Sequence, residues 1–67
     1  MNVIYVPRLG RYVERNPAQQ CWTLTASFRH ASLFHDADNA VVVLHDVYED
    51  CCDTWHLTPE DFSVRTA

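Results

Sequence analysis

The chain has 67 residues, enough for one small domain, and a chain of this length buries only about 60% of the surface that its unfolded form exposes. Apolar residues make up 48% of the sequence and charged residues 21%, which is the composition of a folded protein and excludes a disordered one. The formal net charge is −4 and lysine is absent, which excludes a P-loop lysine and Schiff-base chemistry.

The N-terminal residues predict a β-hairpin. Residues 3–6 are all β-branched or aromatic, which favours a buried strand. Residues 7–10 then supply a turn that ends on Gly10, the only glycine of the chain. Residues 11–15 return as the second strand.

A third strand is predicted after a loop over residues 16–20. From Cys21 to Phe28, apolar residues alternate with small or polar ones at a strict period of two. This pattern is typical of a sheet that is covered on one face only. Residues 31–34 either continue this strand or form another short one.

A helix is predicted from an N-cap at Asp36 to about Asp50, with Asp38 in the first turn complementing the helix dipole. Three consecutive valines, residues 41–43, favour a strand, but the cap and the helical spacing of the apolar residues decide for a helix. The predicted buried stripe consists of Ala37, Ala40, Val41, Leu44, Val47 and Tyr48.

The C-terminal part completes the predicted fold. Residues 53–57 alternate and predict a fourth strand, and Thr58 caps a helical turn that begins at Pro59. Phe62 and Val64 are expected to fold back on the core. The order β-β-β-α-β predicts a single compact domain over residues 1–67 with an α+β fold: a small antiparallel sheet of about four strands and one amphipathic helix packed on one face.

Residues 45–56 read HDVYEDCCDTWH and raise the question of a metal or redox site. Cys51 and Cys52 are adjacent, so in an extended segment their side chains point to opposite faces and are poorly placed to share an ion. Nearby carboxylates raise thiol pKa values and suppress the reactive thiolate. Asp38, His45 and Glu49 lie along one helix face and offer metal ligands, but a solvated polar face is the simpler interpretation.

Catalysis has little support in so short a chain. A single glycine permits no phosphate-binding loop, and 67 residues leave little room for a pocket of about 300 Å³ or more. We therefore expect a protein that is not an enzyme, with no catalytic residue, no cofactor and no metal site. The cysteines are expected to act as small packing residues.

The charges are distributed unevenly along the chain. Residues 1–30 hold four arginines against one glutamate, a net +3, whereas residues 31–67 hold eight carboxylates against one arginine, a net −7. The N-terminal arginines, together with Tyr5, Tyr12 and Trp22, are the combination that binds nucleic acid. A pI near 5.3 points away from a phosphate partner.

The acidic side chains of the predicted helix gather on the side opposite its apolar stripe, with two valines among them. An apolar centre ringed by charge is typical of a protein interface, although a face that only aids solubility is the alternative. The predicted partner-binding residues are Asp38, Val42, Val43, Asp46, Glu49, Asp50, Asp53, Glu60 and Asp61.

The order Tyr5, Gly10-x-Tyr12, Trp22-Thr23, Ala31-x-x-Phe34 and Ala40-x-x-x-Leu44 resembles that of short orphan proteins encoded by bacteriophages and other mobile elements. Many such proteins bind and block a host machine, and the small acidic ones include anti-CRISPR proteins and DNA mimics. The resemblance implies an inhibitor of a host nucleic-acid-binding protein, with a CRISPR effector as the first expected partner.

The sequence also sets expectations for location and assembly. The N-terminus lacks the apolar core of a signal peptide, and no stretch approaches the roughly 20 apolar residues that span a bilayer. We expect a cytoplasmic protein, in the host cell if phage-encoded, that is a monomer or homodimer and binds neither membrane nor nucleic acid directly. The alternative is a small metal- or nucleic-acid-binding regulator that uses its histidines and cysteines or its arginine-rich hairpin.

Overall fold

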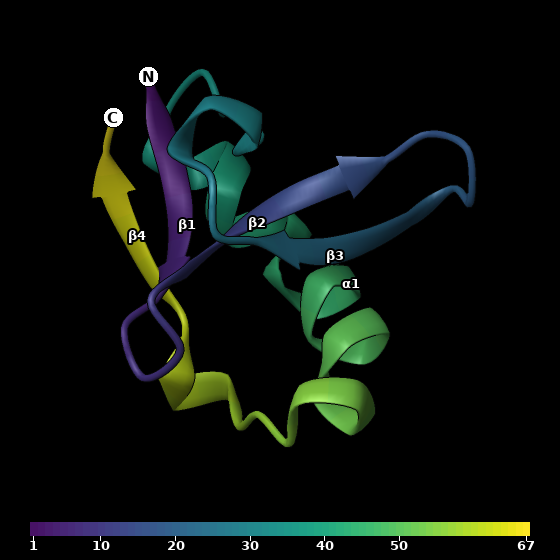
Figure 1. Cartoon of the computed structure of the whole chain (residues 1–67). Coiled ribbons are helices and arrows are strands. Elements are labelled where there is room, and N and C mark those ends of the chain that lie inside the picture. Colours follow the sequence, from purple (N-terminus) through teal and green to yellow (C-terminus); the bar gives the residue numbers. More distant parts are fainter.

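A computed structural model describes the whole chain, Met1 to Ala67, as a four-stranded antiparallel sheet with one long helix packed on one face (Figure 1). The predicted α+β fold and the order β-β-β-α-β are confirmed. The elements are β1 (Asn2–Val6), β2 (Arg11–Asn16), β3 (Cys21–Thr25), the short 3-10 turn η1 (Phe28–His30), α1 (Ala37–Trp55), a second 3-10 turn η2 (Pro59–Asp61) and β4 (Ser63–Thr66). The strands lie in the order β3-β2-β1-β4, so the last strand pairs with the first.

Strands β1 and β2 form the predicted hairpin, but they pair at only two positions next to their turn and then diverge. The segment before the helix fills the gap between them. The N–H of Ser32 donates to the carbonyl of Val13 at 3.0 Å, and Asn2 and Phe34 exchange two backbone hydrogen bonds of 2.8 Å. Residues 31–34 are therefore a short bridging segment, and it places the Phe34 ring in the core.

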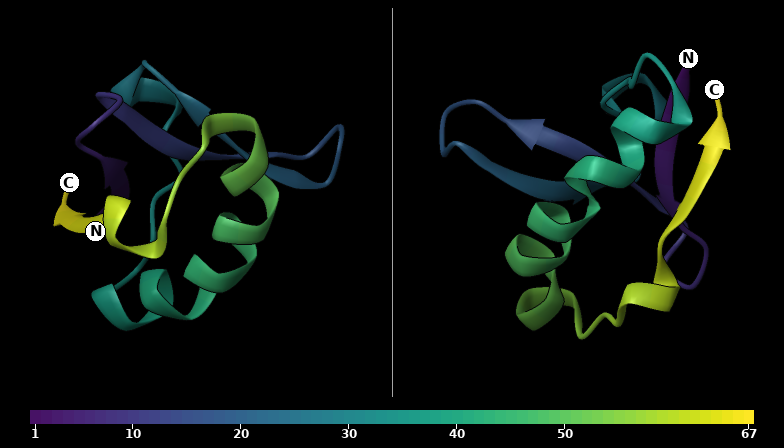
Figure 2. Two further views of the ribbon diagram at one scale, coloured as in Figure 1. Left: turned by 90° about the horizontal axis from the view of Figure 1, so that it is seen from below. Right: turned by 180° about the vertical axis from the view of Figure 1, so that it is seen from behind.

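The core lies between the sheet and α1, and Figure 2 shows the helix along one side of the sheet from two further directions. The sheet supplies four buried side chains and the helix three. The buried cluster comprises Ile4, Val6, Val13, Leu24, Phe34, Ala40, Val47, Cys51 and Leu57. Phe62 and Val64 pack against its margin, as expected from the sequence.

The helix begins where predicted and ends later than predicted. Asp36 is the N-cap, and its carboxylate accepts a hydrogen bond of 2.9 Å from the N–H of Asn39. The helix continues past Asp50 to Trp55 and stops at His56, which adopts the left-handed conformation at φ 54°. The predicted strand over 53–57 is wrong, because an apolar residue at Trp55 extends the helical spacing of the buried positions as readily as it begins an alternation.

The buried stripe of α1 is rotated from the predicted one. Its centre follows Ala40, Val47 and Cys51, which are all buried, at spacings of seven and four residues. Val43 packs against the core, whereas Val41 is 56% exposed. The last turns of the helix, absent from the predicted boundaries, contribute Cys51 to the core and so shift the direction in which the helix faces the sheet.

The third strand is shorter than its pattern predicted. It ends at Thr25, and Ala26 and Phe28 are exposed. Phe28 instead lies on η1, where its ring meets the edge of the Tyr12 ring at a centroid distance of 5.3 Å. The predicted helical turn that begins at Pro59 is confirmed as η2.

Candidate functional site

The side of α1 that faces away from the sheet bears a line of exposed residues, which we call the acidic stripe. They follow one another at spacings of four, four, three and four residues, so they lie on one face of the helix. The acidic stripe consists of Asp38, Val42, Asp46, Glu49 and Asp53. Val42 is 76% exposed, which places an apolar side chain among four carboxylates.

The carboxylates of the acidic stripe have few partners inside the protein. Asp38 and Asp46 take part in no side-chain hydrogen bond or ion pair. Glu49 lies 3.0 Å from the Nε2 of His45, and both side chains are largely exposed, so the pair contributes little to stability. Asp53 accepts only a weak thiol hydrogen bond of 3.8 Å from Cys52. The negative charge of this face is therefore not neutralised by an arginine of the same chain.

The arginines, in contrast, are mostly engaged within the fold. Arg8 is paired with Asp61 at 3.3 Å and donates to the carbonyl of His56 at 2.7 Å. Three others lie over aromatic rings: Arg11 over Trp55 at 5.0 Å, Arg15 over Trp22 at 5.4 Å and Arg65 over Tyr5 at 4.5 Å. Arg29 is exposed, and it is the only arginine whose side chain makes no contact of these kinds.

The sheet separates the arginines and tyrosines that the sequence grouped together. The register pairs Tyr5 with Tyr12, so both side chains lie on the face opposite Ile4, away from the core. Arg11 lies two positions from buried Val13, so it is on the core side of the sheet, next to the helix. The N-terminal hairpin therefore has no single surface that combines these arginines with both tyrosines.

Two of the predicted partner-binding carboxylates hold the fold instead. Asp50 accepts a hydrogen bond of 2.8 Å from the N–H of Trp22, which links α1 to the edge strand β3. Asp61 accepts a hydrogen bond of 2.9 Å from the N–H of Thr58 and forms an ion pair with Arg8. These bonds to Thr58, and next the contact with Arg8, lower the pKa of the Asp61 carboxyl below its ordinary value.

Of the two remaining predicted partner-binding residues, Val43 packs against the core and Glu60 is exposed to solvent. The placement of Val43 on the outer face is wrong, because the rotation of the buried stripe packs it against the core. Glu60 is exposed on η2 and takes part in no hydrogen bond or ion pair, but it lies outside α1. Sequence reasoning missed the role of Asp50, since only the strand order reveals that Trp22 has a free edge N–H.

The three cysteines differ in burial, and only Cys51 belongs to the core. Cys51 is buried, and its thiol donates weakly to the carbonyl of Trp22 at 3.7 Å. Burial, with the nearby Asp50 carboxylate, raises the pKa of Cys51 to about 11, so its thiol stays protonated. Cys51 is thus a core-packing residue, as the sequence predicted. All three cysteines are free thiols.

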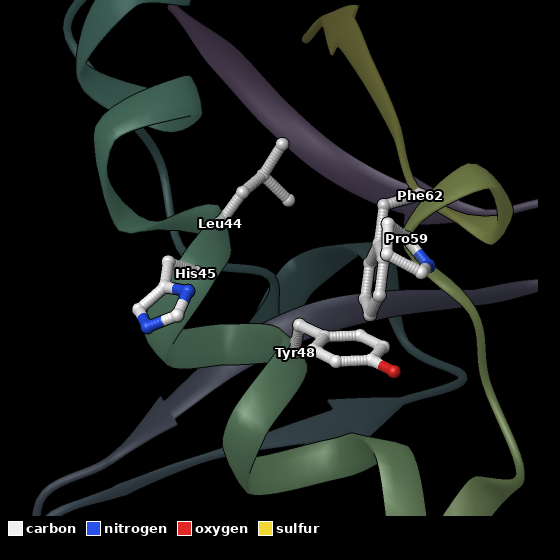
Figure 3. A pocket seen from close by; sticks show the side chains of 5 residues that line it. All are labelled: Leu44, His45, Tyr48, Pro59 and Phe62. Carbon is white, nitrogen blue, oxygen red and sulfur yellow. The ribbon is translucent and has the colours of Figure 1, made fainter.

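One pocket opens between α1 and η2 (Figure 3). It has a volume of about 160 Å³, and its lining residues are Leu44, His45, Tyr48, Pro59 and Phe62. The Tyr48 and Phe62 rings meet edge to face at a centroid distance of 6.5 Å. Small-molecule sites in proteins occupy about 300 Å³ or more, so this pocket is about half that size and has room for about one side chain.

Comparisons of the chain with protein-family models, with curated proteins and with solved structures found no match. No three His, Cys, Asp or Glu side chains lie close enough together to hold a metal ion. None of the helices combines the length and the apolar character needed to cross a bilayer.

Proposed function

We propose that the protein is a non-enzymatic inhibitor that docks the acidic stripe of α1 on a basic surface of a host nucleic-acid-binding protein. One observation supports this proposal most directly. The stripe exposes four carboxylates without an arginine partner, while four of the five arginines are engaged elsewhere in the fold. Mutual repulsion along the stripe persists in the free protein, and a basic partner would relieve it.

The dimensions of the stripe suit a groove that binds nucleic acid. With a rise of 1.5 Å per residue, the distance along the helix from Asp38 to Asp53 is about 22 Å. One strand of DNA places about seven phosphates in that length, at one per 3.4 Å. The stripe has four charges over the same length, so carboxylates would replace only some of the phosphates that the partner's arginines and lysines bind.

Because the stripe has fewer charges than a DNA strand of the same length, apolar contact would supply part of the binding free energy. Val42 lies between the carboxylates of the first and third turns and is 76% exposed. Interfaces bind most strongly where an apolar centre is surrounded by polar groups that exclude water. In this arrangement the carboxylates set the encounter rate and the orientation, and Val42 supplies dry contact area.

A CRISPR effector is the first partner to test, and the host cytoplasm is the corresponding location. This narrower choice is supported only by the resemblance of the element order to that of short phage-encoded proteins. The wider proposal, an acidic helix face against a basic surface, is supported by the charge distribution and does not depend on that choice.

Charge reversal on the stripe tests the proposal. A variant with Asp46→Lys, Glu49→Lys and Asp53→Lys changes three exposed residues and leaves Asp50 free to bind β3. We expect the wild-type protein to retain a basic nucleic-acid-binding protein from host lysate, and the variant to lose it. Glu14→Lys is the matched control, since it reverses a carboxylate on β2, away from both the stripe and the pocket. Retention of the same partner by a folded triple variant would show the proposal to be wrong.

A further inference from the structure

The pocket beside the acidic stripe is formed by the middle of α1 and by η2, which the chain reaches after the short connection at residues 56–58. Leu44 and Tyr48 extend from successive turns of α1, and Pro59 and Phe62 approach from η2 and the residue after it (Figure 3). The edge-to-face contact of Phe62 with Tyr48 forms one wall. The surface of the pocket is therefore mostly apolar, although it is open to solvent on one side.

The size of the pocket limits its occupant to a single side chain. An apolar cavity of about 150 Å³ holds one benzene molecule. At about 160 Å³, this pocket matches one aromatic ring or one large aliphatic side chain. Its aromatic walls favour a ring, because edge-to-face and offset contacts stabilise aromatic pairs beyond their buried area.

The rim connects the pocket to the acidic stripe. His45 lines the pocket, and its Nε2 lies 3.0 Å from the carboxylate of Glu49, a member of the stripe. Val41 lies one helical turn before His45 and is 56% exposed, so it adds apolar surface next to the pocket. A ligand seated in the pocket would thus place its neighbouring residues beside Glu49, and Asp46 lies three residues before Glu49 in the acidic stripe.

We propose that the pocket is the anchor site for the basic partner, and that it takes one aromatic side chain from a segment in which lysine or arginine flanks that side chain. This inference rests on the proposed function and adds the point at which the partner is held. The apolar lining selects the ring, and the carboxylates at the rim select the flanking cations. An acidic flank is disfavoured by the same carboxylates.

A second copy of this chain is the competing occupant. Phe28 is 49% exposed and precedes Arg29, the one arginine whose side chain makes no hydrogen bond, ion pair or cation–π contact, so this dipeptide has the required chemistry. A net charge of −4 on each copy opposes the association. The charge therefore favours a different, basic protein.

Two peptides and an NMR titration of the ¹⁵N-labelled protein test the inference. The first peptide is acetyl-Lys-Arg-Phe-Arg-Lys-amide, and the second has alanine in place of phenylalanine. We expect the phenylalanine peptide to shift the amide signals of residues 44, 45, 48 and 59–62 in addition to those of the stripe. The alanine peptide should bind about tenfold more weakly and shift only signals of the acidic stripe, because it lacks the ring to be buried.

The outcomes separate this inference from the proposed function. Equal affinity of the two peptides, or shifts confined to the stripe, would overturn the anchor site and leave the acidic-stripe mechanism standing. In the variant with Asp46→Lys and Glu49→Lys, we expect binding of the phenylalanine peptide to fall at least about tenfold, and unchanged binding would overturn the role of the rim. Shifts at the pocket that appear on concentrating the protein alone would overturn it in favour of a second copy.

Discussion

The carboxylates around α1 fall into two groups that differ in what they contact. Asp36, Asp50 and Asp61 each accept a backbone N–H at 2.8–2.9 Å: Asp36 and Asp61 cap the starts of α1 and η2, and Asp50 joins α1 to β3. The four carboxylates of the acidic stripe all lie on α1, but none of them accepts a backbone hydrogen bond. An unpaired N–H nearby, and not the residue type, therefore decides which acidic groups stabilise the fold and which stay available to a partner.

The inner and outer faces of α1 extend this contrast to apolar residues. Val47 is fully buried against the sheet, whereas Val42, five residues earlier, is 76% exposed. Val47→Ala should lower the free energy of unfolding by about 2 kcal/mol, because it removes buried methyl groups and leaves a cavity. Val42→Ala should change it by less than about 0.5 kcal/mol, because alanine favours the helix and nothing packs there. Urea unfolding followed by circular dichroism measures both, and equal losses would contradict the assignment of the two faces.

Removing one carboxylate from each group provides the next largest contrast. Asp50→Ala should cost about 1 kcal/mol, since the N–H of Trp22 loses its acceptor at the edge of β3. Asp53→Ala should change the free energy of unfolding by less than about 0.5 kcal/mol. Hydrogen exchange of the Trp22 amide gives a local measure, and it should accelerate in the Asp50 variant alone. An unchanged exchange rate would mean that this hydrogen bond does not protect the edge strand.

A smaller effect of opposite sign is expected within the stripe. Asp46 is three residues from Glu49 and four from Asp50, spacings at which like charges destabilise a helix by about 0.2–0.5 kcal/mol per pair. Asp46→Asn should therefore raise the free energy of unfolding by a few tenths of a kcal/mol at low ionic strength. The gain should vanish at about 0.5 M salt, where charges at this separation are screened. A gain that persists at high salt would have a cause other than repulsion.

Local sequence signals predicted the parts of the fold that depend on neighbouring residues. The hairpin with its glycine turn, the Asp36 cap and the turn that begins at Pro59 all follow from preferences within a few residues. They were sufficient to place the first three strands and the start of the helix, whereas the fourth strand lies at Ser63–Thr66 and not at residues 53–57. The end of the helix was missed, because His56 stops it with a left-handed residue that is not a glycine.

The parts that were missed depend on contacts between distant segments. Asp50 and Trp22 are 28 residues apart, and Arg8 and Asp61 are 53 apart. Val43 was assigned to the wrong face because the direction of the buried stripe depends on Cys51, beyond the predicted helix end. The pocket requires η2 to return to the middle of α1. The acidic stripe, in contrast, follows from helical spacing alone and was largely predicted.

The pH dependence of stability distinguishes Asp61 from a free carboxylate. The hydrogen bond from Thr58 and the contact with Arg8 lower the pKa of Asp61 in the folded protein, relative to about 3.9 for an unfolded chain. A group with a depressed pKa contributes stability above the unfolded value and loses it as the pH falls through the folded value. Asp61→Asn should therefore be less stable than wild type at neutral pH, and the difference should shrink below about pH 4.

The effect is expected to be small, because the carboxylate lies at the surface, where its pair with Arg8 is screened by water, and because the amide oxygen of asparagine can still accept from the N–H of Thr58. Urea midpoints measured from about pH 7 down to about pH 2.5 give the comparison. Glu60→Gln is the control, since Glu60 is exposed on the same turn and should leave the pH profile unchanged. A difference between Asp61→Asn and wild type that stays constant over the whole range would show that the ionised form of Asp61 is not what stabilises the turn.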